Sequence, residues 1–374
     1  MIKGFYIYYQ TKRGYLGVDK KVDDQVNFMS KYIDMEKITI PKKKTNVIKS
    51  IIWRMPFGSY GREYTVAEQI VKDADVIYIR FVPIDLQFIN FIKQLKKNNK
   101  NAKIFLEIAT YPYASELLNK TEMVPFYFKD LVYHRFLKEY VDKVVTYSDD
   151  SEIYGISAIQ IKNGIDVNRI QLVNNIVKKD NSINLIAVAS FQKTHGYERC
   201  IYSLAKYYAQ GGKRNIKIIF VGDGAELDFY RQLVKENSLE QYIVFTGRKE
   251  GEQLQEIYDC ADVALGIFGL YKMSIHKSSA LKIREYLAMG LPVVSACEED
   301  AFDCENTKYY YQLENNDTVF DMREIVGFYD MVYGNNQDRR IIREDIRQYA
   351  LRNIDISVTF KKVIEEINIC KKGL

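Results

Sequence analysis

Short apolar runs alternate with helix-like segments along almost the whole of this 374-residue chain. This pattern constrains the fold because buried parallel strands read as short apolar runs, while the helices between them repeat every 3.6 residues. Two such series of similar size follow one another, separated by a polar stretch at 178–182. At roughly 150 residues per domain, the length also suggests two domains. The sequence therefore predicts an α/β protein with two Rossmann-like domains.

The expected elements fall into two series. In the first, strands are expected at 2–9, 76–81, 102–108 and 141–147, and helices at 22–32 and 85–97. In the second, strands are expected at 185–189, 216–221, 243–246, 263–267 and 292–296, with helices at 196–208, 225–236, 252–260 and 279–289. We expect an N-terminal domain over 1–170, a C-terminal domain over 171–350, and a final segment, 351–374, whose helix packs back on one of the domains, the N-terminal one being the candidate.

The composition excludes several classes of protein. Apolar residues make up 47% and charged residues 28%, which is typical of a globular chain. No apolar run approaches the ~18–20 residues of a membrane span, and a secretory signal is not expected. Five cysteines without a CxxC pair fit reduced thiols in a cytoplasmic protein. The three histidines lack metal-ligand spacing, so we expect no metal site.

The positive charge lies at the front of the chain. Residues 1–170 contain 27 basic and 20 acidic side chains, whereas the remainder has a balance of −2. This asymmetry indicates an anionic partner for the N-terminal half, such as nucleic acid, a lipid surface or a phosphorylated substrate. Nucleic acid ranks last, because neither a helix-turn-helix nor a zinc module is visible.

Ligands of parallel α/β sheets bind where the strands end, at glycine-rich turns and helix N-termini. Residues 10–17 follow the first strand and carry two glycines and two cations, although a solvated basic loop explains them equally well. The second candidate turn contains Gly222 and Gly224. It lacks the third glycine of a dinucleotide fingerprint, so a tight strand-to-helix turn is the simpler interpretation.

The third candidate is the string SSALKIREYLAMGLPVV at 278–294. A serine can cap its helix, and Gly290 ends the helix before a strand. Lys282 and Glu285 share one face near the positive helix end. As an exposed ion pair these two residues contribute only ~0.3–0.5 kcal/mol, which does not explain the whole string.

This string resembles the donor-binding helix of GT-B glycosyltransferases of family GT4, which often reads S-P-L-K-x-R-E-Y-L-A-x-G-x-P-V-V. Other strings similar to the family follow in family order: NGID at 163–166, VASFQKTHGYER at 188–199, FVGDG at 220–224 and VFTGR at 244–248. At the front, GVDKKV at 17–22 and EIATYPY at 107–113 look like bacterial cell-surface polysaccharide members. The resemblance spans roughly residues 1–350 and implies the GT-B fold, two Rossmann-like domains facing across a cleft.

The resemblance also implies an activity. GT4 enzymes transfer a sugar from a nucleotide-sugar, here most simply a UDP- or GDP-sugar, to a glycan or lipid-linked acceptor. Glu285 matches the glutamate that accepts hydrogen bonds from the donor ribose, a role that suits an ionised carboxylate. Cations such as Lys193 neutralise charge on the leaving nucleotide, so neither a metal nor another cofactor is expected. Transfer is expected to retain the anomeric configuration, without a dedicated nucleophile.

The implied site residues form three groups. The candidates for the chemistry are Lys193 and Glu285. The expected donor-binding residues are Ser190, His195, Gly222, Gly224, Gly247, Arg248, Lys277, Ser278, Lys282, Arg284 and Glu285. The expected acceptor-side residues are Gly14, Tyr15, Gly17, Lys20, Tyr111 and Tyr113.

Three positions depart from the family pattern. Ser190 and His195 stand where many members have Arg and Lys in the phosphate loop. Lys277 stands where a second glutamate, which usually contacts the donor sugar, precedes Glu285 by eight residues. A cation there suits an acidic sugar, or else indicates weak activity. Ala280 replaces the usual proline, a change of little expected effect.

The acceptor side carries one further signal. Residues 42–57 combine a basic cluster with Ile48, Ile51, Ile52 and Trp53, the only tryptophan. Such a segment suits a helix that docks on an anionic lipid surface, which places the protein on the inner face of the plasma membrane. An ordinary buried helix with solvated lysines fits these residues slightly better.

Several functions remain open beside a cytoplasmic, metal-independent glycosyltransferase. A nucleotide-sugar 2-epimerase also uses the GT-B fold, but its acid–base chemistry typically requires carboxylates and histidines in the cleft. This chain has only three histidines. A catalytically weak or inactive partner subunit is favoured by Lys277. An NAD-dependent enzyme is disfavoured, because no complete GxGxxG follows a strand.

Overall fold

The computed structural model describes residues 2–9, 16–41, 47–55, 57–58, 63–118, 121–174, 182–302, 308–334 and 338–372. The chain forms two compact units. Unit 1 comprises Met1–Lys162 and Thr359–Leu374, and unit 2 comprises Asn163–Val358. The divisions thus fall close to the positions 170 and 350 that the sequence suggested, with the C-terminal helix belonging to unit 1.

Unit 1 is built on a seven-stranded sheet in the order β2-β1-β3-β4-β5-β7-β6. Its strands pair in parallel except for β6, which is antiparallel to β7. The strands are β1 (Lys3–Tyr9), β2 (Asp34–Ile40), β3 (Val76–Arg80), β4 (Lys103–Ile108), β5 (Lys143–Thr146), β6 (Glu152–Ile153) and β7 (Ile156–Gln160). The inner strands β1, β3, β4 and β5 are buried on both faces, as expected for a parallel sheet covered by helices.

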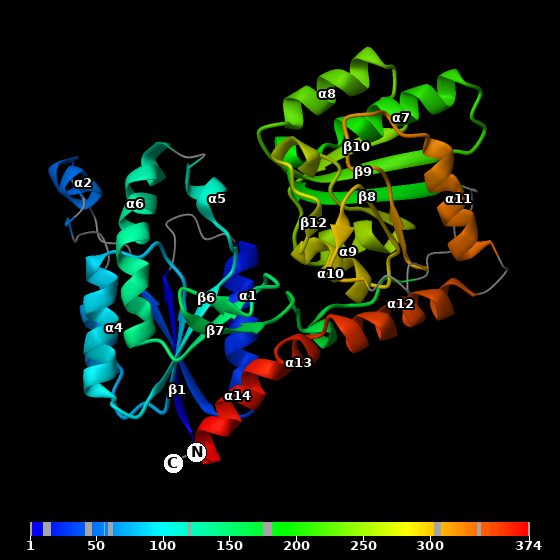
Figure 1. Cartoon of the computed structure of the whole chain (residues 1–374). Helices are drawn as coiled ribbons and strands as arrows, with labels where there is room; N and C mark the ends of the chain where they lie inside the picture. The colour runs from blue at the N-terminus through cyan, green and yellow to red at the C-terminus, as the bar shows by residue number, and fades with distance from the viewer. Residues whose placement is uncertain are drawn as a thin grey trace. The chain divides into compact units, whose positions relative to one another are not determined.

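Helices cover both faces of this sheet, with α4 and α6 on one face and α1 and α14 on the other (Figure 1). The helices are α1 (Leu16–Met29), α2 (Val47–Arg54), α3 (Thr65–Ile70), α4 (Leu86–Asn98), α5 (Ala114–Leu118), α6 (Val124–Tyr133) and α14 (Lys361–Lys372), with short turns η1 (Thr121–Met123) and η2 (His134–Glu139). Asp85 caps α4 by accepting a 2.9 Å hydrogen bond from the Phe88 amide. The apolar stripe of α4 then packs on the sheet.

Unit 2 is built on a six-stranded parallel sheet in the order β10-β9-β8-β11-β13-β15. These strands are β8 (Ile183–Ser190), β9 (Ile216–Asp223), β10 (Ile243–Gly247), β11 (Val263–Leu265), β13 (Val293–Ser295) and β15 (Tyr310–Gln312). A separate two-stranded sheet joins β12 (Lys277–Ser278) to β14 (Glu298–Glu299). The fold prediction of two parallel Rossmann-like sheets is confirmed.

The helices of unit 2 connect these strands. They are α7 (Glu198–Ala209), α8 (Leu227–Glu236), α9 (Gly251–Asp259), α10 (Leu281–Ala288), α11 (Met322–Tyr333), α12 (Arg339–Asn353) and α13 (Ile356–Thr359), with short turns η3 (Val167–Arg169), η4 (Lys193–His195) and η5 (Leu270–Met273). Each unit has its own apolar core, formed by the strands and the inner sides of the helices. Within the described ranges, no helix is long and apolar enough to span a bilayer.

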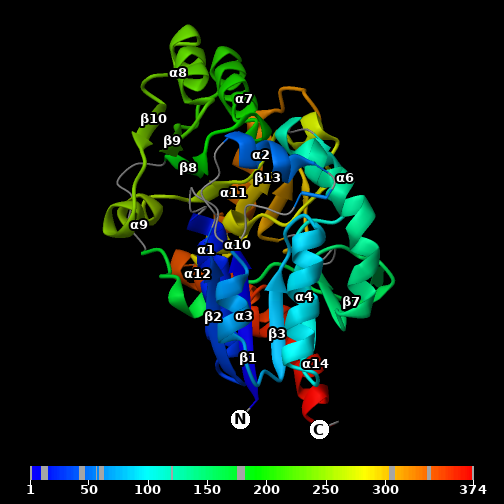
Figure 2. The ribbon, with the colours of Figure 1, turned by 90° about the vertical axis from the view of Figure 1, so that its left-hand side faces the viewer.

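The C-terminal helix packs on unit 1. The ring of Phe360, just before α14, lies 6.4 Å from that of Phe28 and 6.0 Å from that of Tyr78, between centroids. An ion pair of 3.4 Å joins Glu366 of α14 to Lys143 of β5. The chain therefore begins and ends in the same unit (Figure 2).

Candidate functional site

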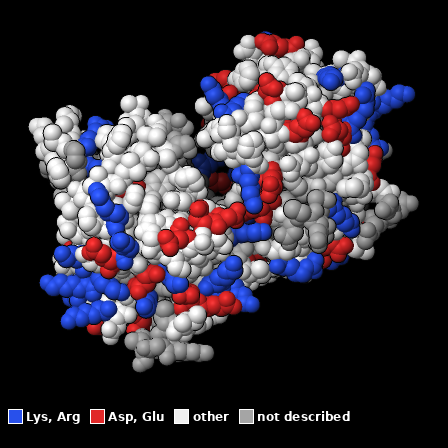
Figure 3. Space-filling model, viewed as in Figure 1, with Lys and Arg blue, Asp and Glu red and all other residues white. Residues whose placement is uncertain are grey.

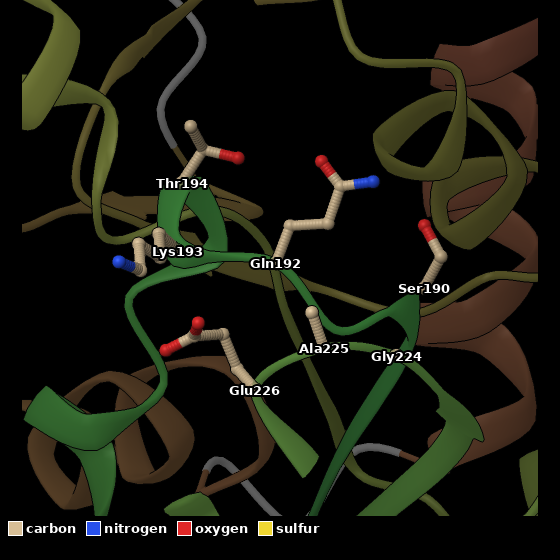
Figure 4. Close-up of a pocket in the computed structure, with 7 residues that line it drawn as sticks. All are labelled: Ser190, Gln192, Lys193, Thr194, Gly224, Ala225 and Glu226. Carbon is tan, nitrogen blue, oxygen red and sulfur yellow. The ribbon is translucent and has the colours of Figure 1, made fainter.

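A pocket of about 420 Å³ opens where β8 and β9 end in unit 2 (Figure 4). It is lined by Ser190, Gln192, Lys193, Thr194, Gly224, Ala225 and Glu226. Ser190 is the last residue of β8, the next three follow that strand, and the others form the turn before α8. In Figure 4 the side chains of Lys193 and Glu226 extend toward one side, whereas that of Ser190 lies on the opposite side. This is the edge at which parallel α/β sheets bind ligands.

Two glycines allow the turns around this pocket to touch. A Cβ atom on Gly222 would lie 1.9 Å from the carbonyl oxygen of Ala189, and one on Gly224 would lie 2.3 Å from that of Phe191. Gly222 also has φ +131° and Gly224 has φ +157°, conformations that other residues rarely adopt. The two glycines are thus required for the close packing of the β8 and β9 turns, which builds one wall of the pocket.

A buried hydrogen-bond network fixes the start of α10. The guanidinium of Arg284 donates to the Asn163 carbonyl at 2.6 Å and pairs with Asp300 at 2.5 Å. Ser279 donates to the same Asp300 carboxylate at 2.8 Å, and Asn163 donates to the Ser279 carbonyl at 2.8 Å. Arg284 is fully buried in these contacts. It therefore holds the helix in place, whereas the sequence suggested that it binds the donor.

Lys282 and His195 gather around the ring of Tyr197. The Lys282 ammonium donates hydrogen bonds of 2.9 Å to the Tyr197 hydroxyl and to the Gly266 carbonyl. The imidazole of His195 lies parallel to the Tyr197 ring, 5.6 Å away between centroids. Nδ1 of His195 accepts a 3.0 Å hydrogen bond from the Gln192 amide. The neutral imidazole therefore carries its proton on Nε2, where it is a hydrogen-bond donor.

Burial shifts the protonation equilibria of this cluster. It lowers the pKa of Lys282 to about 7, although the carboxylate of Glu299 acts in the opposite direction. Burial, with the nearby positive charge of Lys282, lowers the pKa of His195 to about 3. Burial also raises the pKa of Glu299 to about 7. Near neutral pH, Lys282 is therefore close to its titration point, whereas His195 is neutral.

The other residues expected on the donor side lie around this centre with different environments. Lys277 is exposed on β12 and pairs with Glu298 of β14 at 3.5 Å, while Ser278 follows it on the same short strand. Gly247 ends β10 with φ +70° and open space around it. Arg248 is exposed and pairs with Glu250 at 2.7 Å. Glu285 lies half-buried in the middle of α10.

The expected acceptor-side residues belong to unit 1. Gly14 and Tyr15 lie outside the described residues, Gly17 lies in the first turn of α1, and Lys20 is exposed on the same helix. Tyr111 is half-buried after β4. Tyr113 is buried, and its hydroxyl donates to Asp130 and contacts the hydroxyl of Tyr154. Of the two tyrosines, only Tyr111 offers a partly open ring.

A match to a protein family covers the whole of the donor-side cluster. Residues 168–299 match the family model described as Glycosyl transferases group 1. This part of the chain belongs to the group 1 glycosyltransferases. The matched range contains the pocket, the Lys282–Tyr197 contact and α10. The family resemblance that the sequence suggested is thereby confirmed. No curated protein sequence matches the glycosyltransferase.

Solved structures show that the glycosyltransferase has the GT-B fold. A glycosyltransferase from Rickettsia africae ESF-5 superimposes with a TM-score of 0.67 at 14% identity, with all of both chains covered. The lipopolysaccharide outer core galactosyltransferase WaaB has a TM-score of 0.59 at 14% identity, covering 98% of this chain and 99% of its own. The Anabaena protein HepE, in complex with UDP and glucose, has a TM-score of 0.60 at 12% identity, covering 99% and 100%.

Several residues at this site were not anticipated from the sequence. The pocket is also lined by residues that directly adjoin expected ones, namely Gln192, Thr194, Ala225 and Glu226. Their position in the sequence next to Lys193 and Gly224 is the feature from which they could have been predicted. Tyr197 and Gly266 hold the Lys282 ammonium, and nothing in the sequence connects these distant positions. The buried Glu299 was also missed, because an acidic run at 298–300 reads as exposed.

Proposed function

We propose that this glycosyltransferase moves a sugar from a UDP- or GDP-sugar to a glycan or lipid-linked acceptor in surface polysaccharide or related glycoconjugate synthesis. The main support is the convergence of Lys193, Lys282 and His195 at the carboxyl end of β8. The structures of HepE with UDP and of the lipopolysaccharide galactosyltransferase WaaB favour a uridine donor and a surface-glycan acceptor.

In this proposal the N–H donors of unit 2 hold the donor diphosphate. Lys193 lines the pocket, while Lys282 and neutral His195 supply donors beside it. Charge that develops on the leaving nucleotide is stabilised by such preorganised groups, and a lysine that gains a proton adds a full positive charge. Glu285 accepts hydrogen bonds from the ribose hydroxyls. Lys193 and Glu285 are therefore the residues that we assign to the reaction.

The proposed reaction needs no metal and retains the anomeric configuration. The nucleophile is the acceptor hydroxyl, which attacks the face from which the nucleotide departs. Activity that survives excess chelator, and an NMR spectrum of the product with the donor's anomeric configuration, are the expected results. An inverted product would contradict this mechanism.

The first test is thermal unfolding with UDP, GDP, ADP, dTDP and NAD. A ligand at ~100 times its dissociation constant stabilises the native state by ~2.7 kcal/mol, which shifts the melting temperature of a protein this size by several degrees. We expect a shift with UDP or GDP alone, abolished in Lys193→Gln and reduced in Glu285→Gln. Arg231→Gln, an exposed arginine on α8, is the matched control. A shift with NAD alone would contradict the proposal.

A non-catalytic partner subunit is the second candidate, and Lys277 is the observation that favours it. This lysine replaces the glutamate that contacts the donor sugar in relatives, and it is engaged with Glu298. Binding of UDP without hydrolysis or transfer of any UDP- or GDP-sugar would support the second candidate. Turnover of one donor would exclude it.

The acceptor is proposed to bind unit 1 at the carboxyl end of its sheet. Helix α1, which begins at Leu16, follows β1, and Tyr111 follows β4 at the same edge of the sheet. Gly14, Tyr15, Gly17, Lys20, Tyr111 and Tyr113 are the proposed acceptor-side residues. The excess of basic side chains in residues 1–170 favours an anionic acceptor such as a lipid-linked phosphate. We place this reaction in the cytoplasm, at the inner face of the plasma membrane.

A further inference from the structure

Helix α2 turns its apolar side away from the protein. Val47, Ile48, Ile51 and Ile52 recur at helical spacing, and their exposed fractions range from 47% for Ile52 to 77% for Val47. Phe57, three residues after the helix, is 79% exposed. A surface helix of a soluble protein normally buries such a stripe. The buried helix that the sequence slightly favoured for this segment is therefore not what the structure shows.

The opposite side of α2 is anchored to α6. The ring of Trp53 packs against that of Phe126, with 4.5 Å between centroids. Lys129 of α6 is 3% exposed and donates hydrogen bonds to the Trp53 carbonyl and, at 2.6 Å, to the Gly58 carbonyl. A buried ammonium is costly unless it is hydrogen-bonded, so these contacts fix the carboxyl end of α2 on α6. The apolar stripe is thus held outward by specific contacts.

Helix α6 extends the exposed apolar surface. Phe128, Leu131 and Val132 occupy one side of α6 and are between 43% and 60% exposed. Figures 1 and 2 place α2 next to α6 at the same end of unit 1. Figure 3 shows largely uncharged surface at this end, bordered by Lys or Arg side chains. Contiguous exposed apolar surface of this kind marks an interaction site.

The charge of the segment identifies the partner. Between 41 and 62 the chain carries six lysines and arginines and no acidic residue. A second copy of the chain would bring an equally basic segment to the contact, which like charges oppose. An anionic bilayer attracts the basic side chains and accepts the isoleucines and phenylalanines between its headgroups. Both features of the surface are therefore satisfied by one partner.

We propose that α2, Phe57 and the outer side of α6 form a docking surface for anionic phospholipid bilayers. The surface belongs to the segments that follow β2 and β4, at the carboxyl edge of the sheet where the acceptor residues are proposed. It brings a lipid-linked acceptor to that edge without an extended path through water. Vesicle binding requires neither donor nor turnover, so its failure is distinct from failure of the proposed reaction.

The test uses Trp53, the only tryptophan in the chain, as a built-in probe. The full-length protein is mixed with vesicles of phosphatidylcholine containing about 30% phosphatidylglycerol, and with phosphatidylcholine alone. We expect co-sedimentation with the anionic vesicles only. Brominated acyl chains are expected to quench Trp53 fluorescence, because α2 lies at the interface. Wild-type protein that neither sediments nor is quenched overturns the proposal.

Substitutions separate docking from folding. Ile51→Glu with Ile52→Glu is expected to reduce vesicle partitioning at least tenfold, because two charges replace the inserted side chains. The matched control is Ile341→Glu with Ile369→Glu, which places the same charges at exposed isoleucines of α12 and α14. Melting temperature and the thermal shift with UDP should be unchanged in both. Equal loss of binding in the control overturns the proposal.

Two further outcomes decide the role of the anchor and the identity of the partner. Lys129→Met removes the hydrogen bonds to the Trp53 carbonyl of α2 and to the Gly58 carbonyl after it, and we expect weaker partitioning with a red-shifted Trp53 emission before vesicles are added. Size-exclusion chromatography of the wild type is expected to give a monomer. A dimer that the isoleucine substitutions dissociate, without vesicle binding, would show a protein interface and overturn the proposal.

Discussion

Lys282 donates a hydrogen bond of 2.9 Å to the hydroxyl of Tyr197, a residue 85 positions away in the sequence. A second bond of the same length reaches the Gly266 carbonyl. The described residues thus provide acceptors for two of the three N–H donors of a protonated lysine. Both of these partners are neutral groups, so a bound diphosphate would add a negative charge to the one that Glu299 already supplies nearby.

Donor binding should depend on pH through Lys282. The pKa of this lysine is about 7 without ligand, and a bound diphosphate should raise it because opposite charges favour protonation. Binding then takes up protons above pH 7, so affinity is highest below pH 7 and falls as the pH rises through that value. Calorimetry with a UDP-sugar in buffers of different ionisation enthalpy measures the uptake. Lys282→Met should bind more weakly and without proton uptake.

Neighbouring groups provide the control for this pH dependence. Lys282 is influenced by Glu299, whose pKa is raised to about 7, and by the buried thiol of Cys200, whose pKa is also raised. His195 is neutral throughout this range and Tyr197 has a raised pKa. Glu299→Gln removes the negative charge that favours protonated Lys282, so the decline in affinity should begin at lower pH. An unchanged profile in both Lys282→Met and Glu299→Gln would assign the titration elsewhere.

Arg284 should be required for the stability of unit 2. Breaking a buried ion pair leaves a charge without its partner, so Arg284→Met should lower the free energy of unfolding by ~3–5 kcal/mol. Unfolding in urea measures this loss. Arg323→Met is the matched control, because its pair with Asp321 is exposed and should contribute less than ~1 kcal/mol. Similar losses in the two variants would contradict the assignment of Arg284 to the fold.

Gly224 should tolerate no side chain. Gly224→Ala places a Cβ atom 2.3 Å from the Phe191 carbonyl oxygen, so we expect a loss of ~2 kcal/mol or more and weaker UDP binding. Gly327→Ala is the opposite case, because Gly327 lies inside α11 with nothing within 4 Å of the new Cβ atom. It should stabilise the protein by ~0.5–1 kcal/mol. Thermal unfolding compares the two variants directly, and a stable Gly224→Ala protein would show that the turns can separate.

Lys277 should influence the choice of donor sugar rather than stability. Its pair with Glu298 is exposed, so Lys277→Glu should change the free energy of unfolding by less than ~1 kcal/mol. A cation at this position suits an acidic sugar, and we expect kcat/KM for UDP-glucuronic acid relative to UDP-glucose to fall about tenfold in the variant. Wild-type protein that uses only neutral hexose donors would contradict this expectation.

Periodicity predicted most of the architecture. The strands β8, β9, β10, β11 and β13 and the helix at 279–289 were expected within a few residues, because buried parallel strands and amphipathic helices have distinct apolar patterns. The strand β15 was not expected. The edge strand β2 (DMEKITI) was missed, because its three charged residues interrupt the apolar run. The long helix α12 was missed as well, since five arginines and two acidic residues obscure its buried side.

The contacts between side chains were harder to predict from the sequence than the fold. Family motifs identified Lys282 and Arg284 as neighbours on one helix, yet the first lies against Tyr197 and the second is buried with Asp300. A difference of two positions on a helix changes the facing direction, and the partner comes from a distant segment. The orientation of α2 could not be predicted either, because the hydrogen bonds from Lys129 to the carbonyl groups of Trp53 and Gly58 depend on tertiary structure.

The return of the C-terminal helix to unit 1 affects the order in which the protein can be completed during synthesis. Unit 2 is one continuous stretch, so it can finish folding as soon as it has left the ribosome. Most of unit 1 is translated first, but Phe28 and Tyr78 can contact the ring of Phe360 only after the residues that follow unit 2 have emerged. Most of unit 1 is therefore synthesised before unit 2, but its core is completed after unit 2 has been synthesised.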